Sequence, residues 1–222
     1  MNQGFQPAER QQRHSTLSHQ HRMHPDISRF PRDEFYSHDR RNRSLLDGSQ
    51  VASARAWDYN AYPSRSHWLH VSGKVVRNRN EKEVKAVIAE LDRFCGWAAR
   101  QDKTYDVAVL TFYKGQESAL REALQKLPGN AKAYSRFTYK GVAIKLATVD
   151  FFQGQEADLV ILSMVNTHRD GFMDSPNRLN VSITRARYQL LIVGDRDYFA
   201  KRSRTQELKA LAQACSFQGT HE

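Results

Sequence analysis

Four short apolar runs alternate with segments of helical pattern, and this alternation constrains the fold more than any other feature of the sequence. The runs are "DVAVLTF" (106–112), "AIKLATV" (143–149), "DLVILSMV" (158–165) and "QLLIVGD" (189–195). Short, nearly continuous runs rich in valine, isoleucine and leucine are typical of strands that are buried on both faces. Because such strands alternate with helices here, we expect an α/β fold with a mostly parallel sheet covered by helices on both faces.

Helical patterns separate and follow these runs. In the segment 81–99, apolar residues recur at helical spacing, and Asn80 stands where it can cap the start of the helix. Three further helices are expected at 114–127, at about 175–186 and at 205–215. Ser175 and Pro176 offer a cap and a proline in the first turn of the second of these.

The chain has 222 residues, enough for one large domain or two small ones, and we expect one domain with an irregular front end. Residues 1–16 are polar and glutamine-rich, so they are expected to form a flexible stub or linker. Residues 40–79 scatter arginine, serine, asparagine and glycine, which predicts an irregular excursion with one short strand near 68–71. The domain itself is expected to occupy residues 17–222.

The composition is strongly basic, with a formal net charge of +10 and a pI near 9.7. Such a surface attracts polyanions, nucleic acid first and acidic membrane second, although a basic domain can also be merely well solvated. No apolar stretch approaches the ~20 residues of a membrane-spanning helix, and no apolar signal core follows Met1. Two distant cysteines, Cys95 and Cys215, are typical of a reducing compartment. We therefore expect an intracellular protein, cytoplasmic or nuclear, without membrane association.

Polar residues follow two of the expected strands, where open α/β sheets bind ligands. After the first strand, "TFYKGQES" offers a hydroxyl, a ring, a cation and an amide at a strand-to-helix turn, which suits phosphate, although a plain helix start is the simpler interpretation. After the second strand, "TVDFFQGQEAD" surrounds Gly154 with Asp150, Gln153 and Glu156. That density of polar groups is unusual for packing alone.

The stretch "LNVSITRARYQLLIVGD" (179–195) sets Arg185 and Arg187 ahead of an apolar strand. Its first apolar residues recur at helical spacing and can face the sheet, which places Arg185 at the rim of the core. A partly desolvated guanidinium needs an anion. The residues alone leave two alternatives of equal weight: an external anion, or an internal salt bridge to Asp150 or Asp195.

Three histidines gather in "LSHQHRMHPDIS", namely His19, His21 and His24. A zinc site is conceivable there, but no fourth ligand is evident and neither cysteine is near in the sequence. We therefore expect no metal site formed by the protein's own side chains.

Four motifs taken together resemble the second RecA-like motor domain of superfamily 1 helicases. They are "HQHRMHPDIS…FPRDEFY", "VLTFYKGQ", "ATVDFFQGQEADLVILS" and "NRLNVSITRARYQLLIVGD", in the order and spacing of that family. The resemblance covers residues 17–200 and is closest to the branch of RNA/DNA helicases typified by the nonsense-mediated-decay helicase. It implies a RecA-like, three-layer fold, similar to that of P-loop NTPases but without a P-loop of its own.

The resemblance also implies roles for individual residues. Arg22 and Arg185 match the arginines that reach across the interdomain cleft to the nucleotide γ-phosphate and act as arginine fingers. Glu156 matches a glutamate associated with the ribose and with coupling to nucleic acid, in a loop shaped by Gln153 and Gly154.

Two further sets follow from the same resemblance. His21 stands where close relatives often carry a tyrosine near the base, so stacking there would depend on an imidazole. The residues expected to hold the phosphate backbone of a single strand are Thr111, Tyr113, Gln116 and Thr148. Phosphate contacts give affinity without sequence information, as a motor that moves along any sequence requires.

The chain contains no G-x-x-x-x-G-K-[ST] loop, and the nearest candidate, "SGKVV" at 72–76, lacks the spaced first glycine and the final hydroxyl. In the family the first motor domain supplies that loop. We therefore expect ATP with Mg²⁺ to bind jointly with an N-terminal RecA-like domain of the same polypeptide, and single-stranded DNA or RNA to be the partner. The leading hypothesis is a C-terminal helicase motor domain that is inactive alone. The alternative is a stand-alone nucleic-acid-binding or regulatory module without ATPase activity.

Overall fold

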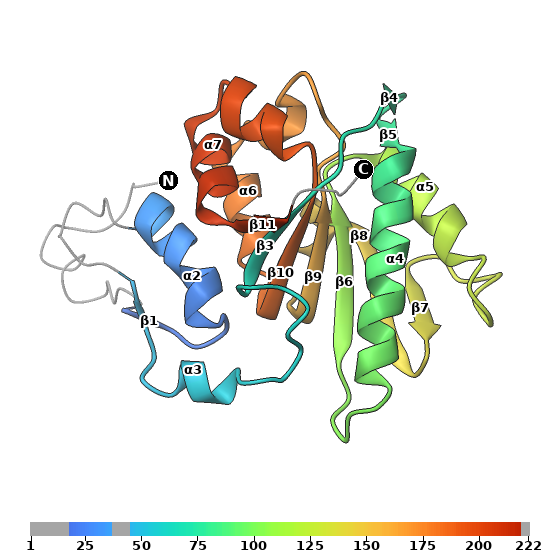
Figure 1. The fold of residues 1–222 in the computed structure, drawn as a ribbon, viewed down its shortest axis with the longest axis horizontal. Helices are drawn as coiled ribbons and strands as arrows, with labels where there is room; N and C mark the ends of the chain where they lie inside the picture. Colours follow the sequence, from blue (N-terminus) through green and yellow to red (C-terminus); the bar gives the residue numbers. More distant parts are fainter. Residues whose placement is uncertain (1–17, 37–44, 219–222) are drawn as a thin grey trace, which may run out of the picture.

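Seven strands form one central sheet in the computed structural model, which describes residues 18–36 and 45–218 (Figure 1). Their order is β11-β3-β10-β9-β6-β8-β7, and every neighbouring pair is parallel except β7 with β8. The bounds are β3 (Ser66–His70), β6 (Asp106–Thr111), β7 (Arg136–Tyr139), β8 (Val142–Thr148), β9 (Ala157–Ser163), β10 (Ala186–Gly194) and β11 (Ser216–Gln218). The expected mostly parallel sheet is confirmed, whereas the stub expected at 1–16 lies outside the described residues.

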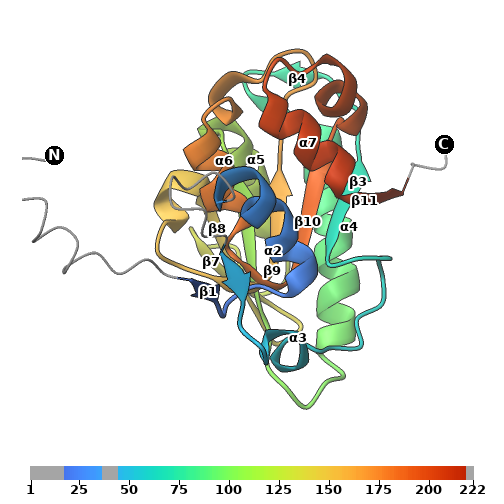
Figure 2. The same cartoon turned by 90° about the vertical axis from the view of Figure 1, so that its left-hand side faces the viewer.

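Helices cover both faces of this sheet (Figure 1, Figure 2). One face carries α4 (Glu81–Ala98) and α5 (Lys114–Leu124), and the other carries α2 (Pro25–Pro31), α6 (Pro176–Ile183) and α7 (Gln206–Ala214). Side chains of β10 alternate between the two cores: Leu191 and Val193 pack on the α4 side, and Leu190 and Ile192 pack on the opposite side. The three-layer, RecA-like architecture predicted from the motifs is therefore confirmed.

Helix boundaries follow the local chemistry of the sequence. Asn80 caps α4, because its side chain accepts a hydrogen bond from the backbone N–H of Glu83. Ser175 stands before α6 without a side-chain cap bond, and Pro176 occupies the first turn as expected. The helix expected at 114–127 ends earlier, at Leu124, where the chain turns before it reaches the proline and glycine.

The segment expected to be irregular, 40–79, contains more regular structure than one strand. Its described part includes β2 (Leu46–Asp47), α3 (Val51–Ala54), β3 and β4 (Val75–Val76). β2 pairs with β1 (His19–Gln20), and β4 pairs with β5 (Arg79–Asn80) in an antiparallel hairpin. A π-helical turn (Arg32–Tyr36) extends α2. Two-residue strands carry no periodicity that a sequence pattern could show.

The two ends of the parallel strands form opposite edges of the domain. Their carboxyl ends lie at the top of Figure 1 beside the hairpin β4–β5, and their amino ends lie at the bottom; we call these the carboxyl edge and the amino edge. Gly115 allows the hairpin to approach α5, since a Cβ there would lie 2.5 Å from the carbonyl oxygen of Arg77. Within the described residues, no helix is both long and apolar enough to span a bilayer.

Candidate functional site

Arg22 reaches the amino edge of the sheet from the turn between β1 and α2. Its Nε lies 2.6 Å from Oε2 of Glu156, which is 134 positions away in the sequence, and its Nη1 donates to the carbonyl of Thr184 at 3.0 Å. Gln20 closes the turn, because its side-chain oxygen accepts from the backbone N–H of Arg22 at 3.0 Å and of Met23 at 2.8 Å. With Met23 buried in the core, the base of the Arg22 side chain is fixed.

Arg185 lies beside Arg22, in the turn between α6 and β10. Its guanidinium donates to the carbonyls of Val181 at 2.8 Å and Gln155 at 3.3 Å, and to the hydroxyl of Thr184 at 3.4 Å. Among the described residues, no carboxylate lies within 4.0 Å of it. Burial, and then the neighbouring charge of Arg22, lower the pKa of Arg185. Arg185 is thus a half-buried cation without a paired carboxylate in the described part of the chain.

The internal salt bridges considered for Arg185 do not form. Asp150 pairs with Arg178 at 3.2 Å instead. Asp195 accepts hydrogen bonds from the backbone of Tyr198 at 2.9 Å and from the hydroxyl of Ser72 at 3.1 Å. Both carboxylates are engaged elsewhere, and the hydrogen bonds of Arg185 go to neutral oxygens instead.

Arg187, only two positions further, has the opposite surroundings. Its guanidinium pairs with Asp106 at 2.8 Å, Asp158 at 2.9 Å and Glu156 at 3.5 Å. Burial alone would lower the pKa of Arg187, but the carboxylates of Asp158 and Asp106 outweigh burial and raise it. Burial, together with the hydrogen bond to Asp106, raises the pKa of Asp158. Arg187 therefore pairs with carboxylates of the protein itself, one of them buried, while Arg185 does not.

The residues expected to hold phosphate lie at the other end of the strands, at the carboxyl edge. Thr111, Tyr113, Gln116 and Thr148 are all buried. The Gln116 amide nitrogen donates to Ser163 Oγ at 3.0 Å, and the Tyr113 hydroxyl accepts from the backbone of Phe172 at 3.1 Å. These buried side chains shape the loops from beneath and do not present themselves at the surface.

The candidate residues thus form two groups at opposite edges of the sheet. The arginines lie at the amino edge, away from the loops at the carboxyl ends of the strands. The reason is topological: the crossover between β8 and β9 carries Glu156 down to the start of β9, and α6 likewise carries Arg185 to the start of β10.

Comparisons with known proteins place the chain in a family. Residues 2–197 match the model of a family described as "AAA domain". The chain belongs to this family. It is 34% identical over 189 residues to the helicase sen1 of Schizosaccharomyces pombe, an alignment that covers 81% of the chain and 10% of that protein. It is 32% identical over 195 residues to the regulator of nonsense transcripts 1 homolog of Neurospora crassa, covering 81% of the chain and 16% of the relative.

A human relative and a solved structure extend the comparison. The probable helicase senataxin of Homo sapiens is 31% identical over 188 residues, covering 80% of the chain and 6% of that protein. The C-terminal domain of a possible DNA helicase from Lactobacillus plantarum shares the fold, with a TM-score of 0.51 at 16% identity over 89% of this chain and 98% of that one. The resemblance to the second domain of superfamily 1 helicases is confirmed. The chain spans less than a fifth of the curated relatives.

The helicase-like loop before β9 is exposed and turns sharply. Gly154 has φ +80°, a left-handed conformation that favours glycine, and Gln153 beside it is exposed. His21 is exposed next to Arg22. Its ring packs against Gly48, where a Cβ would lie 2.4 Å from the imidazole. His21, Gln153 and Glu156 are therefore accessible, and His21 and Glu156 lie at the amino edge with the arginines.

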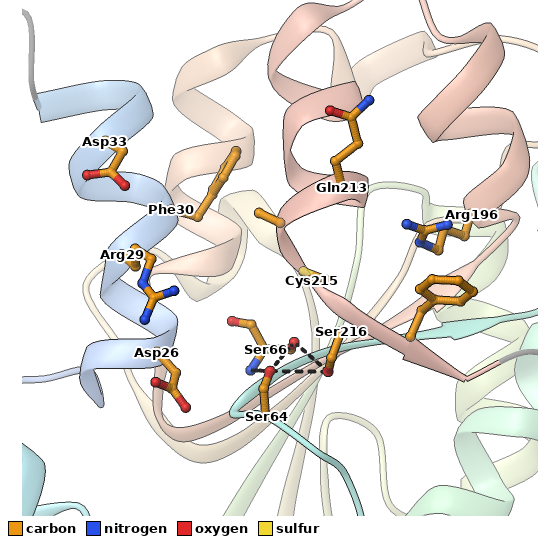
Figure 3. Close-up of a pocket in the computed structure, with 12 residues that line it drawn as sticks. Asp26, Arg29, Phe30, Asp33, Ser64, Ser66, Arg196, Gln213, Cys215 and Ser216 are labelled. Atoms are coloured by element: carbon orange, nitrogen blue, oxygen red, sulfur yellow. Dashed lines mark hydrogen bonds between the residues drawn. The ribbon is translucent and has the colours of Figure 1, made fainter.

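Other features of this helicase-family domain lie away from the arginines. Among the described residues, no group of three or more histidine, cysteine or carboxylate side chains is arranged to hold a metal ion. A cavity of about 640 Å³ opens between α2 and the end of α7, lined by Asp26, Arg29, Cys215 and others (Figure 3). Neither of the two arginines nor Glu156 is among the residues that line it.

Proposed function

We propose that the chain is the C-terminal motor domain of an ATP-dependent DNA/RNA helicase or translocase, in which Arg22 and Arg185 act as arginine fingers. The observation that carries this proposal is the half-buried guanidinium of Arg185, which has no carboxylate within salt-bridge distance among the described residues and lies beside Arg22. Glu156 pairs with Arg22, whereas Arg185 has only neutral partners in the part of the chain that the structure describes, so its charge is repelled by Arg22 and would be stabilised by a further anion. A nucleotide γ-phosphate supplies that anion.

The nucleotide would be ATP with Mg²⁺, bound jointly with an N-terminal RecA-like domain of the same polypeptide. When bound, it supplies the phosphoryl group that is hydrolysed. Arg22 and Arg185 would stabilise the negative charge that develops on that group, in a partly desolvated setting where charge interactions are strong. Glu156 holds Arg22 at 2.6 Å and thereby orients it. Gln153, Gly154, Glu156 and His21 would lie nearest the ribose and base.

The track for a single strand is proposed at the carboxyl edge. Tyr113 and Gln116 support it by bonding the segment that follows β6 to the end of β9 and to the loop after it. Thr111 and Thr148 are the last residues of β6 and β8. The net charge of +10 favours a polyanionic partner, and single-stranded DNA or RNA fits it. A helicase of this kind would work inside the cell, where its nucleic-acid substrate is found.

The test measures ATPase activity of the full-length protein with single-stranded nucleic acid. Arg185→Ala is expected to lower kcat by about 10³–10⁵, the contribution typical of an arginine finger, with little change in the KM for ATP. Arg178→Ala is the matched control, because Arg178 lies on the preceding helix and pairs with exposed Asp150; its kcat should stay near that of the wild type.

Two results would overturn the proposal. One is full activity of Arg185→Ala in the full-length protein. The other is robust ATP turnover by the 222-residue chain alone. If the ATP site is shared with the first motor domain, this chain is inactive without that domain. ATP turnover by the 222-residue chain alone would favour a different catalytic site. Binding of nucleic acid without any ATPase activity in the full-length protein would favour the regulatory-module alternative.

A further inference from the structure

Exposed aromatic rings lie on the segments that follow strands β8 and β9 and on the segment that precedes β7. Among the described residues, the three most exposed large apolar side chains are Phe151 (74% exposed), Tyr134 (71%) and Phe172 (57%). Phe151 follows β8 in a 3₁₀ turn, Val149–Phe152, and Phe172 follows β9 in another, Gly171–Met173. Single exposed rings need no explanation, whereas exposed rings that share one groove mark an interaction surface.

Two of these rings line one groove. Tyr134 and Phe151 flank a cavity of about 520 Å³, a volume within the ordinary range of ligand sites. The same cavity is lined by three basic side chains, Lys114, Arg121 and Lys145, and by one carboxylate, Glu117. Within the described residues neither lysine has an ion pair, whereas Glu117 is already paired with Arg121 at 2.6 Å. The groove therefore combines rings with net positive charge.

Tyr134 is held in a fixed orientation although it is exposed. The guanidinium of Arg121 lies over its ring at 4.1 Å from the centroid, and Nε of Arg121 donates to the carbonyl of Tyr134 at 2.8 Å. Glu117 fixes the other end of the guanidinium. An aromatic ring braced on one face and open to solvent on the rest is pre-organised, so little entropy is lost when a flat group stacks on it.

The opposite side of the groove is braced too. The amide nitrogen of Gln155 donates to the carbonyl of Phe151 at 3.3 Å, and the amide oxygen of Gln155 accepts from the ammonium of Lys145. One glutamine thus ties the turn that presents Phe151 to a cation of the groove. Phe152, the next residue, is buried and anchors the turn in the core.

We propose that this groove, lined by Lys114, Arg121, Tyr134, Lys145 and Phe151, binds the bases of single-stranded nucleic acid. Bases stack on Tyr134 and Phe151, and the adjoining phosphates pair with Lys114 and Lys145. Every base has an aromatic face, so stacking tolerates any sequence. Charge complementarity selects a polyanion over an apolar peptide. The assignment rests on the proposed function, since it places one part of the track, and it adds base contacts to contacts with the backbone.

The experiment measures binding of fluorescent oligothymidylate and oligouridylate to the 222-residue chain by anisotropy. Tyr134→Ala and Phe151→Ala should each weaken binding by about 5–150-fold, as expected when one base is no longer stacked. Tyr134→Phe keeps the ring and should bind like the wild type. Phe217→Ala is the matched control, because Phe217 is an exposed ring under an arginine, Arg196 at 3.7 Å, on the far edge strand β11.

Charge and stacking are separated by two further measurements. Replacing both Lys114 and Lys145 by alanine should reduce the slope of log K against log salt by about 0.7 for each phosphate that is no longer neutralised, whereas Phe151→Ala should leave the slope unchanged. An abasic oligonucleotide of the same length keeps the phosphates. Its binding should not respond to Tyr134→Ala.

The outcomes distinguish this site from the proposed function. If the wild-type chain binds an oligonucleotide but Tyr134→Ala and Phe151→Ala bind it equally well, the groove is not a base-binding site, while the track as such stands. An equal reduction of affinity for normal and abasic strands would also overturn the stacking assignment. If the wild-type chain binds neither oligonucleotide, the track and the groove both fail.

Discussion

Replacing each of the two neighbouring arginines by methionine tests whether the structure has assigned them correctly. Arg187 pairs with three carboxylates, at 2.8, 2.9 and 3.5 Å. Arg185 donates hydrogen bonds to neutral oxygens and lies beside the like charge of Arg22. Methionine keeps a similar apolar stem in both places. We therefore expect Arg187→Met to destabilise the fold strongly and Arg185→Met to have little effect.

The magnitudes follow from burial. Breaking a fully buried pair costs about 3–5 kcal/mol, and Asp158, with its side chain only 5% exposed, would be left with its charge uncompensated. Because Arg187 itself is 28% exposed and its other partners more so, we expect about 2–3 kcal/mol for Arg187→Met. At roughly 2–4 °C per kcal/mol for a domain of this size, Tm falls by about 4–12 °C. For Arg185→Met, relief of repulsion offsets the hydrogen bonds that are removed, leaving a change within about 1 kcal/mol.

The assay is thermal and urea unfolding of the chain at pH 7.5, followed by circular dichroism. Without Arg187, the pKa of Asp158, already raised by burial, should rise further. A carboxyl with a raised pKa stabilises the fold below its unfolded value and loses that contribution as pH rises, so the deficit of Arg187→Met should be smaller at pH 5 than at pH 7.5. Destabilisation by Arg185→Met equal to that by Arg187→Met would refute the distinction between the two arginines.

Three further predictions concern the core and its helices. Gly96→Ala should raise the free energy of unfolding by roughly 0.5–1 kcal/mol through helix propensity, since a Cβ there would lie 3.6 Å from its nearest neighbour, Nζ of Lys140. Gly115→Ala should lower it, because a Cβ there would lie 2.5 Å from the carbonyl oxygen of Arg77. A loss of stability in Gly96→Ala, or a gain in Gly115→Ala, measured by urea unfolding, would contradict this. Burial raises the pKa of Glu83 to about 8. The contribution of Glu83 to the free energy of unfolding is therefore fully present below about pH 4.5 and is lost as pH rises through 8. The urea midpoint of the wild type should therefore fall between pH 6 and pH 9, and Glu83→Gln should make this fall smaller. A fall of the same size in Glu83→Gln would show that Glu83 does not cause it. Cys95 is fully buried, and burial raises the pKa of its thiol to about 12, so a thiol reagent should label Cys95 only on unfolding; rapid labelling of Cys95 in the native chain would contradict its buried position.

Much of the fold could be predicted from periodicity, because the elements that build the core carry it. β6, β8, β9 and β10 coincide with apolar runs, and α4 begins at its predicted cap, Asn80. The edge strands β7 and β11 and the hairpin β4–β5 could not be predicted. They are short, and β7 alternates exposed and buried residues too briefly to differ from a loop.

The candidate site could be predicted only as a set of residues, not as a place. The motifs named Arg22, Arg185 and Glu156, and the structure brings them together. The same motifs named Gln116 and Thr111, whose side chains turn inward. A motif records which residue types recur at a spacing, but it does not record whether a polar atom meets a partner inside the protein or faces solvent.

The sequence by itself determined the α/β class, the basic surface and the family, because apolar periodicity, charge and motif order are properties of the chain. Only the tertiary structure separated Arg185 from Arg187. The order β10-β9-β6 sets the first residues of three parallel strands side by side, so Asp106 and Asp158 meet Arg187, while the turn before β10 leaves Arg185 with backbone oxygens. Strand order is decided by packing between residues far apart in the chain, and it therefore decides which of two neighbouring charges is paired with carboxylates and which is not.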